Sequence, residues 1–184
     1  MNCINRCSWV NLQNLRYVAY HDHEWGKPNH DDHYLFEMLV LESFQAGLSW
    51  ECILNKRDNF RRAFDNFDIQ KVANYDDGKV AELLSNSGII RNRLKIKAAI
   101  LNAKVFQQIQ AEYGTFDQYL WHFTNGQMVV NRDGIVRVTS PLSDAISQDL
   151  QNRGMKFVGS TIIYSYLQAA GVIDDHEPNC DLSK

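Results

Sequence analysis

The chain has 184 residues, of which 45% are hydrophobic and 22% are charged, and only three are proline. This length allows one domain with a full hydrophobic core, and this composition excludes disordered and fibrous proteins. The formal net charge of -3 gives no overall attraction to nucleic acid, and no apolar run approaches the roughly 20 residues that span a membrane. The N-terminus lacks the basic-then-apolar order of a signal peptide, so we expect one cytoplasmic domain over residues 1–184 with reduced cysteines.

Apolar residues recur at helical spacing along most of the chain, between residues that can cap helices. The first strong pattern follows Asp31 or Asp32 and ends near Gly47, and Ser49 can cap a second one that runs through Phe64. Further helices are expected after Asp68, from Asp76 to Gly88, from Asn92 to Tyr113, after Thr115, from Ser143 to Arg153 and from Ser160 to Ala170. The pattern predicts an all-α fold.

Residues 125–139 have a different pattern, which contains VVNRDGIVRV. Asp133 and Gly134 form a turn signal there between β-branched residues. A two-stranded hairpin is only marginally stable unless it packs on something else. We therefore expect an extended loop at this place and helix elsewhere.

The stretch from Tyr17 to Trp50 contains most of the side chains that are able to do chemistry. It includes several aromatic rings, and Glu42 lies inside an apolar helical run, on the same face as apolar residues three, four and seven positions before it. Aromatic faces attract cations, and a carboxylate held against them is partly desolvated. The combination suits a flat, positively charged ligand, although an exposed helical glutamate is the simpler interpretation of Glu42 alone.

Two cysteines and two histidines near the two ends of the chain could form a structural zinc site that joins those ends: Cys7, His21, His176 and Cys180. Each of these residues alone is more often a surface histidine or a buried thiol than a ligand. A competing interpretation places two metals on HDHE, residues 21–24, and HDDH, residues 30–33, for phosphoester hydrolysis. Because the second cluster lies in a polar stretch, a solvated helix cap is the simpler account of it.

The segment RGMKFVGST, residues 153–161, joins two expected helices through a turn that contains glycine. Gly159 would let an anion approach the first amide groups of the second helix, and Lys156 would add a positive charge. The segment resembles the helix-hairpin-helix of DNA repair glycosylases, although those proteins usually have glycine where Phe157 stands. An ordinary turn explains these residues alone at least as well. The basic run from Arg91 to Lys97 is a second candidate contact for DNA, or else a solvated helix face.

Six pieces of the sequence, in this order, resemble the 3-methyladenine DNA glycosylase I family of constitutive bacterial enzymes: CSWV, YVAYHDHEWG, LFEMLVLESFQAGLSW, GIIRNRLKI, KFVGSTIIYSYLQAAG and the terminal HxxxC. The resemblance covers nearly the whole chain. It implies an all-α fold of the helix-hairpin-helix superfamily, and hydrolysis of the bond between deoxyribose and methylated adenine in double-stranded DNA by a cytoplasmic monomer. Ser43 and Phe44 stand where the family more commonly has glycine and glutamine.

The resemblance also implies a pocket for the damaged base, formed by four aromatic residues and one carboxylate: Tyr17, Tyr20, Trp25, Glu42 and Trp50. Methylation at position 3 makes adenine cationic and therefore already a good leaving group. The expected catalytic residue, Glu42, would act mainly by recognition, because it accepts hydrogen bonds from the base and supplies the opposite charge.

The remaining roles implied by the resemblance concern zinc and DNA. The ligands of a structural Zn2+ ion fall on the four residues near the chain ends: Cys7, His21, His176 and Cys180. Contacts with DNA are expected from Lys156, Gly159 and Ser160. No lysine follows directly after Gly159, so we expect a monofunctional enzyme without a Schiff-base step. A DNA-binding module without activity and a metal-dependent hydrolase are the alternatives.

Overall fold

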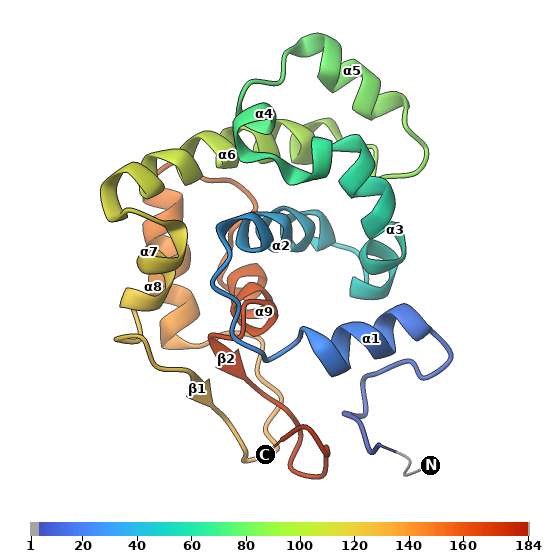
Figure 1. Ribbon diagram of the computed structural model, residues 1–184, viewed down its shortest axis with the longest axis vertical. Coiled ribbons are helices and arrows are strands. Elements are labelled where there is room, and N and C mark those ends of the chain that lie inside the picture. Colours follow the sequence, from blue (N-terminus) through green and yellow to red (C-terminus); the bar gives the residue numbers. More distant parts are fainter. Residues whose placement is uncertain (1–3, 184) are drawn as a thin grey trace.

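The computed structural model describes residues 4–183 as a mostly helical protein (Figure 1). The elements in chain order are α1 (Leu15–His23), α2 (Asp32–Gln45), α3 (Trp50–Ala63), the 3-10 turn η1 (Asp65–Phe67), α4 (Ile69–Ala73), α5 (Asp77–Ser85), α6 (Arg93–Tyr113), α7 (Phe116–His122), β1 (Val129–Val130), α8 (Pro141–Asn152), α9 (Ser160–Ala169) and β2 (Ile173–Asp174). The prediction of a mostly helical fold is confirmed.

The α-helices other than α9 begin where the sequence offers a side chain that can cap them. The side chains of Asp31, Ser49 and Asn92 accept hydrogen bonds from backbone N–H groups in the first turns of α2, α3 and α6. The start of α8 differs from the prediction, because the helix begins at Pro141 and not at Ser143. Ser140 caps it through a reciprocal pair of hydrogen bonds with Ser143, and proline suits the first position of a helix.

The two short strands pair in a way that the sequence pattern did not predict. β1 lies in the expected loop, but its partner is β2, with Val129 opposite Ile173 in a parallel register. The turn signal at Asp133 therefore does not close a hairpin, and the expectation of helix everywhere outside residues 125–139 is wrong at β2. Ile173 is buried, so the tail supplies the packing that an isolated ribbon would lack.

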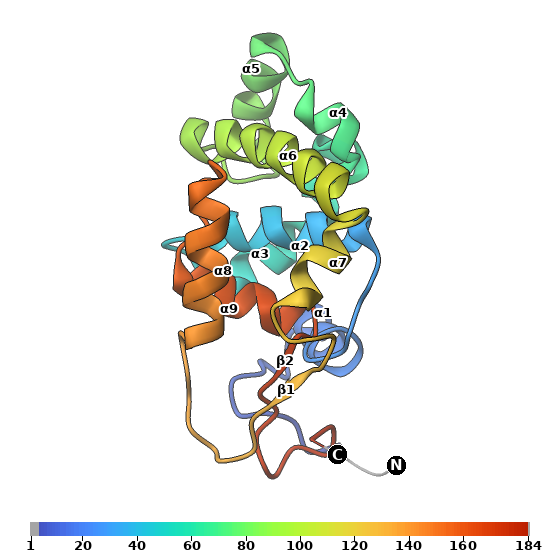
Figure 2. The ribbon, with the colours of Figure 1, turned by 90° about the vertical axis from the view of Figure 1, so that its left-hand side faces the viewer.

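α2 runs through the centre of the molecule. In both views α6 lies on one side of it, and α1 and α9 lie on the other (Figures 1 and 2). The ten residues 35–44 of α2 are all buried, and the buried apolar side chains of the protein form one cluster around them. A helix that is buried on every side has no solvent face, so any charged group on it needs a partner or a function.

The segments near the two chain ends lie side by side. The N–H group of Asn5 donates to a carboxylate oxygen of Asp181 at 2.8 Å, and the N–H group of Asp181 donates to the carbonyl of Asn5 at 2.9 Å. Ser8 and Glu177 make a similar contact further along. Within residues 4–183, no helix has both the length and the apolar character needed to cross a membrane.

We predict that Gly171→Ala lowers the free energy of unfolding by more than about 3 kcal/mol, because its φ of +72° is unfavourable for alanine and the added Cβ would lie 2.0 Å from the carbonyl carbon of Lys27. Gly126→Ala is the matched control. Its φ is +74° but nothing lies within 4 Å of the added Cβ, so about 1 kcal/mol is expected. Urea unfolding of both variants checks this, and equal losses would contradict the close approach.

Candidate functional site

A cavity of about 280 Å3 lies between α1, the C-terminal end of α2, the start of α3 and α9. We call it the aromatic pocket. All five residues predicted for the base pocket line it: Tyr17, Tyr20, Trp25, Glu42 and Trp50. The other lining residues were missed by the sequence analysis: Trp9, Gln45, Val136, Arg137, Ser165 and Gln168. Trp9 lies in the CSWV motif, which could have identified it, whereas the loop around Arg137 carries no such signal.

Each ring of the aromatic pocket is positioned by a different feature of the chain. Tyr17 and Tyr20 lie three residues apart on α1 and therefore share a helix face. Trp50 is the first residue of α3, and its ring centroid lies 5.2 Å from that of Tyr20. Trp25 follows α1, and its ring centroid lies 4.8 Å from that of Trp9, edge to face. The rings thus form a nearly continuous wall.

Glu42 introduces a carboxyl group into this wall from the buried helix α2. Its side chain is only 2% exposed, and its Oε2 has no hydrogen-bond partner among the described residues. Burial raises the pKa of Glu42 to about 8. The indole Nε1 of Trp50 is also buried without a partner. The pocket therefore holds an unused acceptor and an unused donor, as expected of a site that is completed by a polar ligand.

A second buried glutamate on α2 shows how the fold treats a carboxylate with a structural role. Glu37 is 3% exposed, and it accepts hydrogen bonds from Arg57 at 2.7 Å and from Arg61 at 2.8 Å. Arg57 also pairs with Glu24 at 2.7 Å. Two carboxylates on one helix thus share the same degree of burial, and only Glu37 has cations beside it.

Three of the four predicted metal ligands come together beside Trp25, and the fourth, His176, packs next to them. The ligand atoms of Cys7, His21 and Cys180 all lie within 4.8 Å of one another, and the three residues are buried. His176 is also buried, and its ring centroid lies 5.2 Å from that of His21. The ring of His176 also packs edge to face on Trp25 at 4.7 Å. The cluster therefore supports one wall of the aromatic pocket.

Two thiols and two imidazoles are the donor set that structural zinc sites use. Each histidine bonds a carboxylate through Nδ1, His21 with Asp22 at 2.9 Å and His176 with Asp174 at 2.6 Å, so Nε2 is the ring atom that would coordinate a metal. The Nε2 of His21 lies 3.4 Å from the backbone nitrogen of Cys7 and 3.7 Å from the Sγ of Cys180. The Nε2 of His176 is buried and has no partner among residues 4–183. Burial raises the pKa of Cys7 to about 12, so its thiol needs a cation nearby to ionise.

The competing clusters of histidine and aspartate do not converge. The ring of His30 pairs with Asp117 at 2.8 Å, and the ring of His33 contacts the backbone carbonyl of Asn66. His23 is exposed. In the part of the chain that the structure describes, only the cluster around Cys7 brings three or more potential metal ligands together. The geometry gives no support to a two-metal site.

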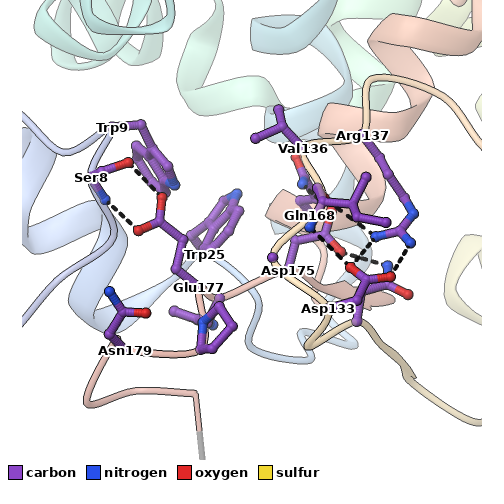
Figure 3. Close-up of a pocket in the computed structure, with 15 residues that line it drawn as sticks. Ser8, Trp9, Trp25, Asp133, Val136, Arg137, Gln168, Asp175, Glu177 and Asn179 are labelled. Carbon is purple, nitrogen blue, oxygen red and sulfur yellow. Dashed lines mark hydrogen bonds and ion pairs between the residues drawn. The ribbon is translucent and has the colours of Figure 1, made fainter.

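A larger cavity of about 500 Å3 adjoins the aromatic pocket, and Figure 3 shows the residues that line it. On one side Ser8 donates to Glu177 from its hydroxyl at 2.6 Å, and on the other side Arg137 pairs with Asp133. Five residues line both cavities: Trp9, Trp25, Val136, Arg137 and Gln168. The aromatic pocket thus opens toward the loop after β1 and toward the C-terminal tail.

The three predicted DNA contacts lie at the connection between α8 and α9. Lys156 and Gly159 are exposed, and no side chain caps the amide groups at the start of α9. The hydroxyl of Ser160 is 2.9 Å from that of Ser143. Phe157 has a φ of +55°, in the left-handed region that favours glycine. The turn therefore has the backbone conformation expected if glycine stood at position 157. The same helix α9 carries Ser165 and Gln168 into the aromatic pocket.

The basic run from residue 91 to residue 97 is less exposed than the sequence suggested. Arg91, Arg93 and Lys97 are exposed, but Lys95 is only 7% exposed and points into the protein. The interpretation of all four as one surface patch is therefore wrong for Lys95. Its position three residues into an amphipathic helix places it on the buried face.

We predict that Glu42→Gln becomes progressively more stable than the parent protein between pH 5 and pH 8. The pKa of Glu42 rises from 4.5 to about 8 through burial, so the folded state binds the proton more tightly than the unfolded state. The free energy of unfolding of the parent should then fall with rising pH in this range, by on the order of 1 kcal/mol per pH unit. Urea unfolding at several pH values tests this, and a constant difference between the two proteins would contradict it.

Comparisons with known proteins agree with the resemblance seen in the sequence motifs. The Methyladenine glycosylase family matches residues 9–184. DNA-3-methyladenine glycosylase 1 of Escherichia coli (strain K12) is 44% identical over 180 residues, which are 96% of each chain. A crystal structure of 3-methyladenine DNA glycosylase I has a TM-score of 0.93 at 42% identity, over 97% of this chain and 99% of that chain.

A further crystal structure shows a variant of 3-methyladenine DNA glycosylase I in complex with 3-methyladenine. It has a TM-score of 0.93 at 33% identity, over 98% of both chains. Sequence and structure thus agree over nearly the full length of the chain. The protein belongs to the methyladenine glycosylase family.

Proposed function

We propose that the protein is a DNA-3-methyladenine glycosylase that acts in base excision repair and hydrolyses the N-glycosidic bond of 3-methyladenine in alkylated double-stranded DNA. The observation that carries the proposal is the unpaired carboxyl group of Glu42, buried among the aromatic rings of the pocket. The relatives that match over nearly the whole chain carry this activity in their names. A neutral, purely apolar ligand would leave Glu42 without a partner, whereas a cationic purine satisfies it.

Recognition begins when the damaged nucleotide leaves the base stack, since a base inside a duplex cannot reach a pocket of this depth. The rings of Tyr20 and Trp50 would offer their faces to the flipped purine. Glu42 accepts hydrogen bonds from the edge of the base and supplies the opposite charge. Trp50 can donate from its free indole nitrogen.

Burial makes Glu42 selective for charge. Its pKa of about 8 means that ionisation at neutral pH is unfavourable until a cation enters and pairs with it. Neutral adenine cannot provide that compensation, so it would bind more weakly than a methylated, cationic base. The pocket therefore distinguishes damaged from normal adenine by charge as well as by shape.

Bond cleavage needs little proton transfer, because the leaving group is already positively charged. The electron pair of the bond between C1′ and the base passes to the ring, which leaves as a neutral purine, and water adds to C1′ with loss of a proton. Loss of the positive charge also weakens the attraction between the product and Glu42. The same carboxylate thus favours the reactant over the product.

The cluster of Cys7, His21, His176 and Cys180 would hold a structural Zn2+ ion. Four protein ligands leave no open position for water, so such an ion supplies folding energy and takes no part in the reaction. It would clasp the N-terminal segment to the tail and hold His176 against Trp25. This role explains why a polar tail folds onto the pocket at all.

DNA binding is assigned to α8, α9 and their connection, acting as a helix-hairpin-helix. Uncapped amide groups at the start of α9 suit a phosphate, and Lys156 adds an exposed positive charge. Ser160, Thr161 and Ile162 follow Gly159, so no amine is available there for a Schiff base. The reaction therefore ends at the abasic site, and the enzyme is monofunctional.

We predict that the protein releases free 3-methyladenine from methylated duplex DNA, and that Glu42→Gln lowers the single-turnover rate on the order of a hundredfold through loss of the charge. Chromatography of the released bases measures both. Glu51→Gln is the matched control, because Glu51 lies close to Tyr17 but outside the pocket, and its rate should equal that of the parent. Strand or phosphate products that disappear with chelator would favour the metal hydrolase, and DNA binding without base release would favour an inactive module.

The zinc assignment predicts about one zinc ion for each freshly purified chain, and a loss of more than about 3 kcal/mol in stability for Cys180→Ser. Metal analysis and thermal unfolding check this. Cys52→Ser is the control, because Cys52 is a half-buried free cysteine outside the cluster and should change stability little. Zinc-free parent protein with undiminished stability would overturn the assignment.

Lys156→Ala is predicted to weaken binding to any DNA sequence and to reduce the slope of log affinity against log salt by about one, because one phosphate contact is lost. Fluorescence anisotropy at several salt concentrations measures the slope. The control variant is Lys104→Ala, because Lys104 is an exposed lysine on α6, outside the hairpin. If both variants keep the parent slope, the hairpin does not touch phosphate.

A further inference from the structure

Lys95, on the buried face of α6, bonds to the end of another helix. Its Nζ donates to the backbone carbonyl of Phe44 at 2.8 Å and to that of Ala46 at 2.6 Å. Carbonyls at the C-terminal end of a helix have no partner within the helix, and the end carries a partial negative charge. Lys95 therefore caps α2 at the point where the chain enters the turn of residues 46–49.

That turn borders the aromatic pocket. Gln45 before it and Trp50 after it both line the pocket, while Gly47 and Leu48 at its tip are exposed. Gly47 has a φ of +77°, so the turn depends on a conformation that few residues other than glycine adopt. The direction in which the turn leaves α2 is set by the carbonyls that Lys95 holds.

Asn102, on the same helix α6, bonds to the connection between α8 and α9. The side chain is 1% exposed and makes two hydrogen bonds with the backbone of Lys156: Nδ2 donates to its carbonyl, and Oδ1 accepts from its N–H group, both at 2.9 Å. An amide side chain used in this way replaces a backbone partner on both of its edges. The segment of residues 153–159 is thereby tied to α6 at one defined position.

Two buried serines lie beside the next two carbonyls of that segment. Ser43 on α2 lies within hydrogen-bond distance of the carbonyl of Phe157 at 3.1 Å, and Ser147 on α8 donates to that of Val158 at 2.7 Å. With Asn102, side chains from three helices lie beside three consecutive carbonyls, although the hydroxyl of Ser43 is closer to the carbonyl of Leu39, at 2.8 Å. These contacts fix the backbone position of the segment. The amide groups that follow at the start of α9 have no side-chain cap.

Lys95 and Asn102 lie seven residues apart, so they share one face of α6 and are separated by roughly 10 Å along its axis. Figure 2 shows the end of α8 and the connection that follows it meeting the N-terminal half of α6. One rigid helix therefore contacts both the turn beside the pocket and the hairpin. Polar groups are rarely buried this deeply without a specific reason.

We propose that Lys95 and Asn102 are positioning residues, through which α6 fixes the spacing between the turn of residues 46–49 and the hairpin of residues 153–159. This rests on the proposed function, in which the hairpin holds a phosphate and the aromatic pocket holds the flipped base. The two are joined by one nucleotide of fixed reach, so the phosphate site and the pocket entrance must be held at a matching distance. Neither residue touches the substrate.

The test compares three quantities in each variant: affinity for undamaged duplex DNA, affinity for free 3-methyladenine, and the single-turnover excision rate. Asn102→Ala should weaken binding to DNA about tenfold, because the hairpin would lose the equivalent of one hydrogen bond to a DNA phosphate. The affinity for free 3-methyladenine should be unchanged. Lys95→Met should lower the excision rate about tenfold, while both affinities change less than about twofold. The conservative variant Lys95→Arg, which keeps the donors, should show a smaller loss in the same quantity.

Ile109→Val, a loss of one buried methyl group on the same helix, controls for general loss of stability and should leave all three quantities unchanged. The proposal is overturned if Asn102→Ala and Lys95→Met each lower both affinities and the excision rate together, in proportion to the fall in melting temperature. In that case α6 only supports the fold. The proposal is also overturned if both variants keep the parent's two affinities and excision rate. Failure of the proposed function would look different, because the parent itself would then release no 3-methyladenine.

Discussion

A carboxyl group buried without a cation is the feature on which the rest of this structure depends. Glu42 lies on α2, a helix whose residues 35–44 are buried on all sides. Glu37, five residues earlier on the same helix, has Arg57 and Arg61 beside it, which is the usual arrangement for a buried carboxylate. The fold holds Glu42 in place through the packing around α2, and that packing leaves its Oε2 without a partner among the described residues. In the proposed function, a cationic base supplies the opposite charge.

The ends of the chain complete the pocket that surrounds this group. Trp9 and Trp25 would have little support if the N-terminal segment and the tail were apart, since His176 packs directly on Trp25. The pairing of β1 with β2 and the close approach of Gly171 to Lys27 bring the tail to this place. The proposed zinc ion would thus stabilise the pocket wall through the same contacts that join the chain ends. The mostly polar tail thus supports one wall of the aromatic pocket.

Much of this could be predicted from local sequence, because helix caps and apolar spacing act over a few residues. Asp31, Ser49 and Asn92 each begin a helix as their side chains suggest. The five pocket residues came from motif resemblance, since nothing in the spacing of Tyr17 and Trp50 shows that they meet. The pairing of β1 with β2 depends on contacts about 44 residues apart, between Val129 and Ile173, and no local pattern encodes such a pairing.

Burial of Lys95 and the contribution of Arg137 to the pocket were missed for the same reason. A lysine in a basic run looks like a surface residue until the carbonyls at the end of α2 are seen beside it. The loop that carries Arg137 has no periodicity from which its position could be predicted. The loop follows β1, and the pairing of β1 with β2 in the tail brings it beside the aromatic rings. The sequence predicted that Glu42 lies on one buried face of its helix, whereas residues 35–44 of α2 are buried on every side.

The coupling between the charge of Glu42 and a cationic base can be measured directly by NMR, by following the side-chain carboxyl carbon of Glu42 through a pH titration with and without 3,9-dimethyladeninium, an analogue that stays positively charged because a methyl group stands in place of the sugar. In the free protein, burial should give a pKa of about 8. The bound cation should lower that pKa, because a positively charged purine favours the ionised carboxylate. A pKa near the ordinary value of 4.5 in the free protein, or one that bound base leaves unchanged, would contradict the account of recognition given above.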